Sequence, residues 1–114
     1  MPFNMILDEK KTPYPDAMPK PGGTVTLTPD NITPETHTPS AENVAAGGRS
    51  YYLRVSAPCR FSVATTDYEF DKENEAYIDS SEVRLIRLAV PGKWETLTIV
   101  GDQTSATVRL EETQ

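Results

Sequence analysis

Three short runs of β-branched and aliphatic residues follow one another between residues 83 and 110, and Pro, Gly or Asp residues separate them. In the last run, Ala106, Val108 and Leu110 alternate with polar residues, so one face of this strand would be apolar and the other hydrated. Runs of this length and composition predict antiparallel strands. We therefore expect a β-meander here, with its apolar face covered by other strands.

Two further runs, residues 51–56 and 59–64, alternate in the same way and are separated by Ala57 and Pro58. They predict two strands joined by a tight turn. A chain of 114 residues has room for a single core. The predicted fold is therefore all-β: an antiparallel, jelly-roll-like β-sandwich that occupies residues 44–114.

Prolines dominate the first part of the chain, since eight of the ten lie within residues 1–42. Proline removes backbone donors and fixes φ, so we expect residues 1–43 to form an extended arm. Only residues 24–28 have the pattern of a strand, at a sheet edge, and residues 40–50 are predicted to hold at most a turn or two of helix. Forty extended residues reach on the order of 120 Å, which suits an arm that lies across neighbouring molecules.

The charge of the chain is −6, and seven acids against one base lie between residues 67 and 82. Without a basic stripe we expect no nucleic-acid partner. No apolar run has the length of a signal-peptide core or a membrane span, so we expect no membrane partner and synthesis in the cytoplasm. Residues 67–75 carry an acid at every second position, which favours a hydrated loop over a calcium site, and both readings stay open.

Residues for chemistry are scarce. The single cysteine, Cys59, alternates with Phe61 and Val63, so we expect it to pack in the core, and the single histidine, His37, lies in the proline-rich stretch. No nucleotide-binding, hydrolase or zinc-protease motif is present. We therefore expect no catalytic residue, cofactor or metal, and a protein that is not an enzyme.

Aromatic residues are the better indication of a contact surface. Trp94 follows a turn sequence, where its ring could either cap the core or contact a partner, and Tyr52 falls on the polar face of its strand.

From residue 49 onward the chain resembles the small β-sandwich accessory proteins of tailed-bacteriophage virions, the capsid decoration or cement type. The likeness covers residues 49–111 and depends on strand order and loop placement. The runs that carry it are Tyr-x-Leu-Arg-Val at 51–55, Cys-Arg-Phe-Ser-Val at 59–63, the acidic insertion, Glu-Val-Arg-Leu-Ile-Arg-Leu-Ala-Val-Pro-Gly at 82–92, Leu-Thr-Ile-Val at 97–100 and Ala-Thr-Val-Arg-Leu at 106–110. The resemblance implies a structural protein of the virion, whose extended terminus fastens neighbouring capsomers.

The resulting hypothesis is a non-enzymatic decoration protein that is located in the virion. It would bind the major capsid protein or another virion protein and form homo-oligomers such as trimers, and deletion of residues 1–42 would leave its domain folded. The alternative is a carbohydrate-binding or adhesive sandwich with Tyr52, Tyr68 and Trp94 as stacking platforms and the acidic loop as a calcium site. The residues expected to bind a partner are Pro13, Tyr14, Pro15, Pro19, Pro21, Pro29, Ile32, Pro34, Pro39, Tyr52 and Trp94.

Overall fold

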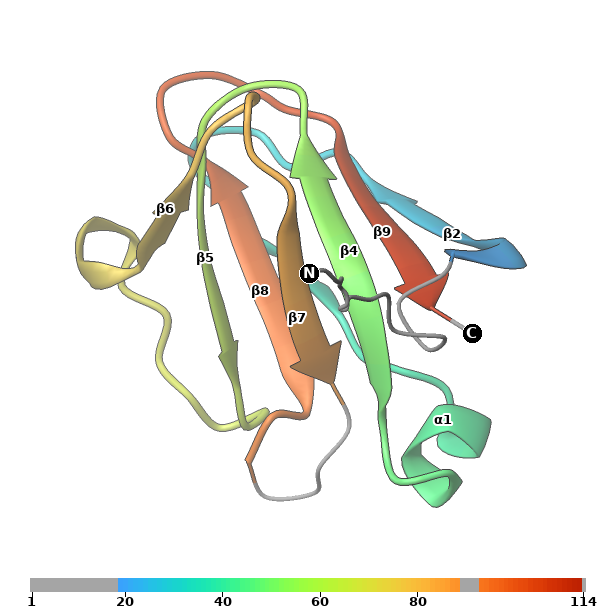
Figure 1. Cartoon of the computed structure of the whole chain (residues 1–114). Coiled ribbons are helices and arrows are strands. Elements are labelled where there is room, and N and C mark those ends of the chain that lie inside the picture. Colours follow the sequence, from blue (N-terminus) through green and yellow to red (C-terminus); the bar gives the residue numbers. More distant parts are fainter. Residues whose placement is uncertain (1–18, 89–92, 114) are drawn as a thin grey trace, which may run out of the picture.

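The computed structural model describes residues 19–88 and 93–113 as two antiparallel sheets of four strands each (Figure 1). The prediction of an all-β antiparallel sandwich is confirmed. The first sheet has the strand order β2 (Pro19–Leu27), β9 (Val108–Thr113), β4 (Arg49–Val55), β7 (Arg84–Leu88). The second sheet has the strand order β3 (Glu35–His37), β8 (Thr96–Gly101), β5 (Cys59–Ala64), β6 (Ala76–Ile78).

The core lies between the sheets because each strand turns its alternate apolar residues inward. Leu53 of β4 and Leu110 of β9 are partners in the register, and neither is exposed to solvent. Leu97 and Ile99 of β8 are buried in the same way from the other side. The buried cluster consists of Tyr51, Leu53, Val55, Cys59, Phe61, Ile78, Ile86, Leu88, Leu97, Ile99, Ala106, Val108 and Leu110.

The strands pair from the two ends of the described chain inward. The first strand, β2, pairs with the last, β9; β3 pairs with β8; β4 pairs with β7; and β5 pairs with β6. Every pair is antiparallel, so the chain resembles one long hairpin that has been rolled into two sheets.

This topology corrects one expectation. The strands β7, β8 and β9 alternate between the sheets and do not form a β-meander. The expected turn at Ala57 and Pro58 is present between β4 and β5, and it joins strands of different sheets. Alternation along a strand shows which side chains are buried, but the partner can lie beside the strand or across the core.

Residues 19–43 belong to the sandwich, which corrects the arm expected over residues 1–43. The strand β2 lies at the edge of the first sheet, as predicted for residues 24–28, and β3 forms an edge of the second. Between them, the backbone carbonyls of Pro29 and Asp30 accept hydrogen bonds from Ala106 N (3.0 Å) and Gly101 N (2.8 Å). The part of the expected arm at residues 1–18 lies outside the described residues.

The non-strand elements are short. The helix α1 (Ala41–Ala45) begins after Ser40, whose side chain accepts a hydrogen bond from Asn43 N, in agreement with the expected turn or two of helix. Figure 1 shows α1 beyond the lower end of β4. A single 3₁₀ turn, η2 (Lys72–Asn74), interrupts the acidic stretch before β6. In the described residues no helix is both long and apolar enough to cross a bilayer.

Candidate interaction surface

The outer edge of β7 is the longest regular free edge in the described part of the sandwich. Five consecutive residues of β7 pair with β4 on one side, and no described strand pairs on the other. The other edges are shorter or interrupted: β3 and β6 have three residues each, and β2 contains prolines and a register shift between Pro19 and Thr24. Prolines, irregularities and short lengths are the usual protection of an edge against pairing, and β7 has none of these three.

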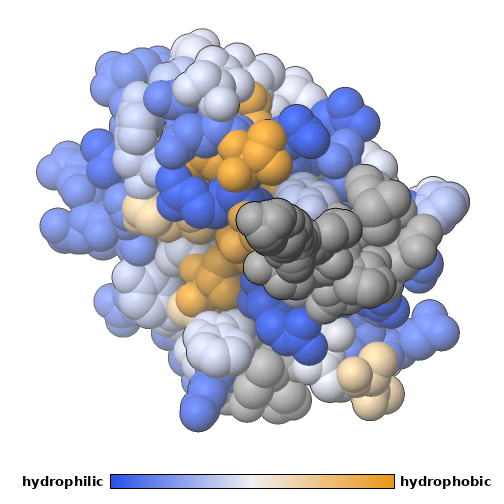
Figure 2. All heavy atoms as spheres, in the orientation of Figure 1, coloured by the Kyte–Doolittle hydropathy of each residue, from blue (hydrophilic) through white to orange (hydrophobic). Residues whose placement is uncertain are grey.

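Two exposed aliphatic side chains lie on this edge. Val83, just before β7, is 48% exposed, and Leu85 is 55% exposed. Tyr52 of β4 is the register partner of Leu85, so their side chains share the outer face of the first sheet. In Figure 2, hydrophobic atoms lie along the middle of the face in view and hydrophilic residues surround them.

Next to these residues, one side of the sandwich is open. A hollow of about 420 Å³ is lined by Val63 of β5, Ile86 and Arg87 of β7, and Trp94. The hollow exists because β6 pairs only with residues 59–61 of β5, so no described strand covers the half of β5 that carries Val63. Trp94 is 48% exposed at this hollow. This exposure is intermediate between that of a residue that caps the core and that of a contact residue, the two roles expected for Trp94. We call Val83, Leu85 and the lining of this hollow the β7 flank.

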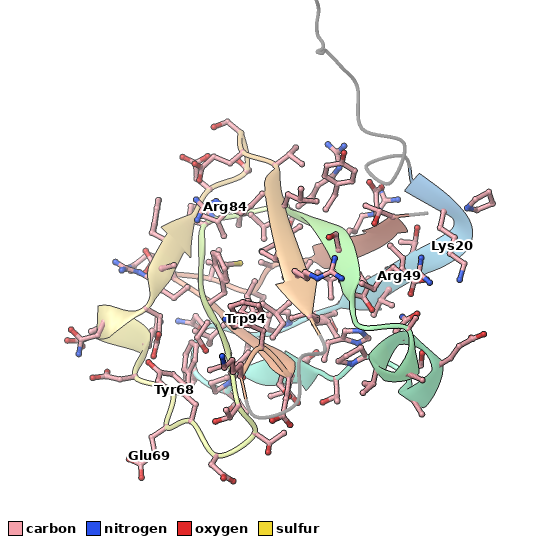
Figure 3. The ribbon with its side chains drawn as sticks, turned by 60° about the horizontal axis from the view of Figure 1, so that its bottom comes forward. Lys20, Arg49, Tyr68, Glu69, Arg84 and Trp94 are labelled. Carbon is pink, nitrogen blue, oxygen red and sulfur yellow. The ribbon has the colours of Figure 1, made fainter. Side chains whose placement is uncertain are left out.

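The two arginines of β7 are held in place by hydrogen bonds; Arg87 lines the hollow and Arg84 lies on the same strand. The Arg84 guanidinium lies 5.5 Å from the centroid of the Phe61 ring and donates to the Tyr77 carbonyl at 3.1 Å. The Arg87 guanidinium donates to the Gly47 carbonyl at 3.1 Å and to Ser50 Oγ at 3.3 Å. Arg84 also forms an ion pair with Glu82 at 3.3 Å. The β7 flank is therefore apolar at its centre, with two guanidinium groups along the strand of which one is paired with a carboxylate (Figure 3 labels Arg84 and Trp94).

A second group of polar residues surrounds Glu112 of β9, on the side of the first sheet away from β7. Its carboxylate accepts hydrogen bonds from Lys20 Nζ and from Asn43 Nδ2, both at 3.0 Å. Asn43 also donates to the Tyr51 hydroxyl (3.2 Å) and accepts from Arg49 Nε (3.3 Å). We call these five residues the Glu112 cluster; Figure 3 shows Lys20 and Arg49 on the side of the sandwich that carries α1.

The charges and hydrogen bonds of the Glu112 cluster stabilise the fold. Burial raises the pKa of Glu112, but hydrogen bonds and charges from Lys20, Asn43 and Arg49 outweigh it and hold the pKa below its usual value. Burial lowers the pKa of the neighbouring His37 against the opposing charge of Glu112, and its ring packs edge-on against Tyr51. Each polar group of the cluster is paired with another, so the cluster connects β2, α1, β4 and β9.

Cys59 has the surroundings of a packing residue. Its side chain is fully buried, and its thiol donates to the Ala57 carbonyl. Burial, with a smaller effect of the Asp102 charge, raises the pKa of this thiol to about 11, so it is protonated at neutral pH. The prediction that Cys59 packs in the core is confirmed.

The acidic residues 67–75 form a loop that is mostly exposed and whose last residue, Glu75, is buried. Glu75 is buried and accepts hydrogen bonds from the Tyr68 hydroxyl (2.8 Å) and the Asp71 backbone N–H (2.8 Å). Glu75 raises the pKa of Tyr68 through this hydrogen bond. In the part of the chain that the structure describes, no three acidic, histidine or cysteine side chains are grouped so that they could hold a metal ion.

The structure separates the residues that were expected to bind a partner. Pro29 and Pro39 are buried inside the chain itself, which corrects their assignment as contacts. Pro19 begins β2, Pro21 and Pro34 are exposed, and Ile32 is 80% exposed in the loop between β2 and β3. Pro13, Tyr14 and Pro15 lie outside the described residues.

Tyr52 and Trp94 both lie near β7, but in different settings. Tyr52 is half-buried on the outer sheet face, whereas Trp94 lies at the hollow. Tyr68, the third proposed stacking residue, is in the acidic loop and does not line that hollow. The exposed aliphatic residues of this surface that the sequence analysis did not single out are Val83 and Leu85. The signal for Leu85 is its position next to Ile86, since adjacent apolar residues in a strand must face opposite sides.

Comparison of the chain with protein-family models, with curated protein sequences and with solved structures found no match.

Proposed function

We propose that this protein is a non-enzymatic structural protein of a virion, a capsid decoration or cement protein that binds the viral shell and neighbouring copies and so stabilises the assembly. Residues 19–43 are built into the sandwich, so the attaching arm in this proposal is residues 1–18. A protein that binds only the assembled shell lowers the free energy of the assembled state relative to its free subunits.

The observation that supports this function is the β7 flank. An open apolar hollow beside an unprotected strand edge is a surface suited to another protein chain, and the exposed Leu85 and Val83 extend it. The virion as the location of that partner follows from the resemblance of residues 49–111, and the flank supports the broader claim of a protein-binding module.

The strand order supports the finer fold assignment within this proposal. We infer a jelly roll, since the pairs β2–β9, β3–β8, β4–β7 and β5–β6 are those of a hairpin rolled into two sheets. Jelly rolls with eight strands are found in viral capsid proteins and in lectins. The fold is therefore compatible with a virion protein and also with the carbohydrate-binding alternative.

The test uses particles purified by density gradient from the organism that encodes the chain. The full-length protein should be present in the purified particles, and added protein should co-sediment with particles from which it has been stripped. A variant that lacks residues 1–18 should fold but fail to co-sediment. Absence of the protein from the particles would overturn the proposal, and undiminished binding of the truncated variant would overturn the role of the arm.

A specific observation favours one alternative, a carbohydrate-binding module: the half-exposed Trp94 ring beside an apolar hollow. Aromatic rings at such positions stack on sugar faces. Glycan-array binding that is lost in Trp94→Ala and retained in Tyr68→Ala would favour this function, because Trp94 lines the hollow and Tyr68 does not.

A further inference from the structure

We propose that residues 3–7 of a neighbouring copy add to the outer edge of β7 as a fifth, antiparallel strand of the first sheet, with Met5 opposite Ile86. This inference rests on the proposed function, because it identifies the surface on which the N-terminal arm fastens one copy to the next. We call residues 3–7 the donor segment.

The acceptor is the β7 flank. Alternate residues of β7 point their backbone N–H and C=O groups away from β4, and no described strand satisfies them. Ile86 and Val63 form an apolar hollow directly beside this edge. A strand added here would satisfy the backbone groups and cover the hollow with its inward side chains, which is the usual mode of peptide binding at a sheet edge.

The donor segment has the matching pattern. Within residues 1–18, outside the described part of the chain, residues 3–7 read Phe-Asn-Met-Ile-Leu, and residues 8–12 after them are all charged or polar. Phe3, Met5 and Leu7 would share one face of a strand. A segment with alternating apolar residues and no internal proline can form a continuous ladder.

The register makes both faces of the added strand compatible with β7. With Met5 opposite Ile86, the apolar side chains of residues 3, 5 and 7 lie over the hollow. Ile6 then lies opposite the exposed Leu85 on the outer face, and Asn4 lies opposite Arg87. An antiparallel strand also brings its C-terminal end to Arg84, so the acidic residues Asp8 and Glu9 follow beside a guanidinium.

The length of the linker allows a neighbouring copy to be the donor. In the first sheet, β2 and β7 are separated by three strand spacings, about 14 Å. The eleven residues between Leu7 and Pro19 include Pro13 and Pro15, and in a polyproline conformation they span about 34 Å. A strand added outside β7 lies four strand spacings from β2, about 19 Å, so the linker is long enough for β7 of its own chain as well as for that of a neighbouring copy. The proposed fastening of one copy to the next requires the neighbouring copy, and the cross-link distinguishes the two donors.

The test is a cross-link between two different single-cysteine additions. Ile6→Cys and Leu85→Cys proteins are mixed at equal and high concentration and oxidised mildly; the native thiol, Cys59, is buried and has a raised pKa. Residues that face each other in adjacent strands are close enough for a disulfide. We expect a covalent heterodimer, identified by mass, with a yield several times that of the matched mixture of Ile6→Cys and Thr26→Cys. Thr26 is exposed on β2, at the opposite edge of the same sheet.

The outcomes separate this inference from the proposed function. Equal heterodimer yields with Leu85→Cys and Thr26→Cys would overturn the inference. The double variant Ile6→Cys, Leu85→Cys would overturn it as well if it gave only an intramolecular bond. Particle binding is measured separately with the unmodified protein. Particle binding without the cross-link would therefore leave the proposed function intact, and the cross-link without particle binding would refute the virion role alone. Circular dichroism of each variant checks that it is folded.

Discussion

At the scale of single residues, Asn43 shows how a polar side chain can hold a sandwich together. It is buried in α1, yet its amide donates to Glu112 of β9 and Tyr51 of β4 and accepts from Arg49. Buried polar groups are stable only when they are paired, so removing one member leaves the others unsatisfied. The sequence offered no sign of this role beyond the turn or two of helix expected in this segment, because the partners are up to 69 residues away.

We predict that Asn43→Ala lowers the free energy of unfolding by about 2 kcal/mol, the cost of leaving buried partners without a hydrogen bond. The matched control is Asn74→Ala, which removes an exposed amide that donates only to Asp71 and should change stability by less than about 0.5 kcal/mol. Urea unfolding followed by circular dichroism measures both. Equal midpoints for the two variants would show that the Glu112 cluster contributes nothing to stability.

The lowered pKa of His37 predicts a pH dependence of folding. Burial disfavours the charged ring in the folded state, so the unfolded chain binds a proton more tightly. The stability that the neutral ring contributes is therefore complete above the unfolded pKa of about 6.5 and is lost as the pH falls below it. Glu112, whose pKa is also lowered, loses its contribution in the same direction at more acidic pH, below its ordinary value of 4.5.

The measurement is the urea midpoint at pH 7.5, 6.5 and 5.5. Because His37 is the single histidine, His37→Gln should reduce the decline between pH 6.5 and 5.5 while the wild type becomes less stable. A decline of the same size in the variant would assign it to other groups.

At the scale of elements, the alternation of apolar and polar residues predicted where the long strands lie, but it did not predict which strands pair with one another. Residues 51–56 and 59–64 were expected as strands and appear as β4 and β5, because each has an apolar face of sufficient length. The strands β3 and β6 were missed since three residues are too few to show a period. The β7 flank was missed for a related reason: whether an apolar residue of a strand is covered depends on which strands lie beside it.

The strand β7 offers a direct test of its orientation, since its neighbouring residues Leu85 and Ile86 face opposite sides. Leu85→Lys places a charge in solvent and should change the free energy of unfolding by less than about 0.5 kcal/mol. Ile86→Lys buries a charge beside the hollow and should cost about 3 kcal/mol or more, or prevent folding. Thermal unfolding of the two variants compares them, and a larger loss for Leu85→Lys would mean that the strand is turned the other way.

At the scale of the whole molecule, the prolines misled the domain assignment. They indicated extended backbone correctly, but extended backbone can also be the edge of a sheet, and residues 19–27 pair with β9. Composition could not distinguish the two, because the partner of β2 lies at the other end of the chain. What the sequence did establish was the class of fold, one core and no disulfide framework.

The truncations follow from this correction. Deletion of residues 1–18 should leave a cooperatively folded domain, whereas deletion of residues 1–42 removes β2 and β3 and exposes Leu110 and Ile99 at new edges. We therefore expect loss of the native fold in the longer deletion, the reverse of the expectation from the sequence. Dispersion of amide signals in NMR spectra of both proteins provides the measurement, and a dispersed spectrum for the longer deletion would show that β2 and β3 are dispensable.

The pairing of β2 with β9 also determines when this protein can fold during synthesis. The strand made first among the described residues has to remain unpaired until the ribosome has produced the strand made last. The innermost pair, β5 with β6, is separated by the fewest residues, and the later pairs enclose it. Because distant pairings form slowly, the nascent chain exposes its apolar faces at least until β9 has been made. Early termination of translation, before residue 108, would therefore leave a chain that lacks an interior strand of the first sheet and is prone to aggregate.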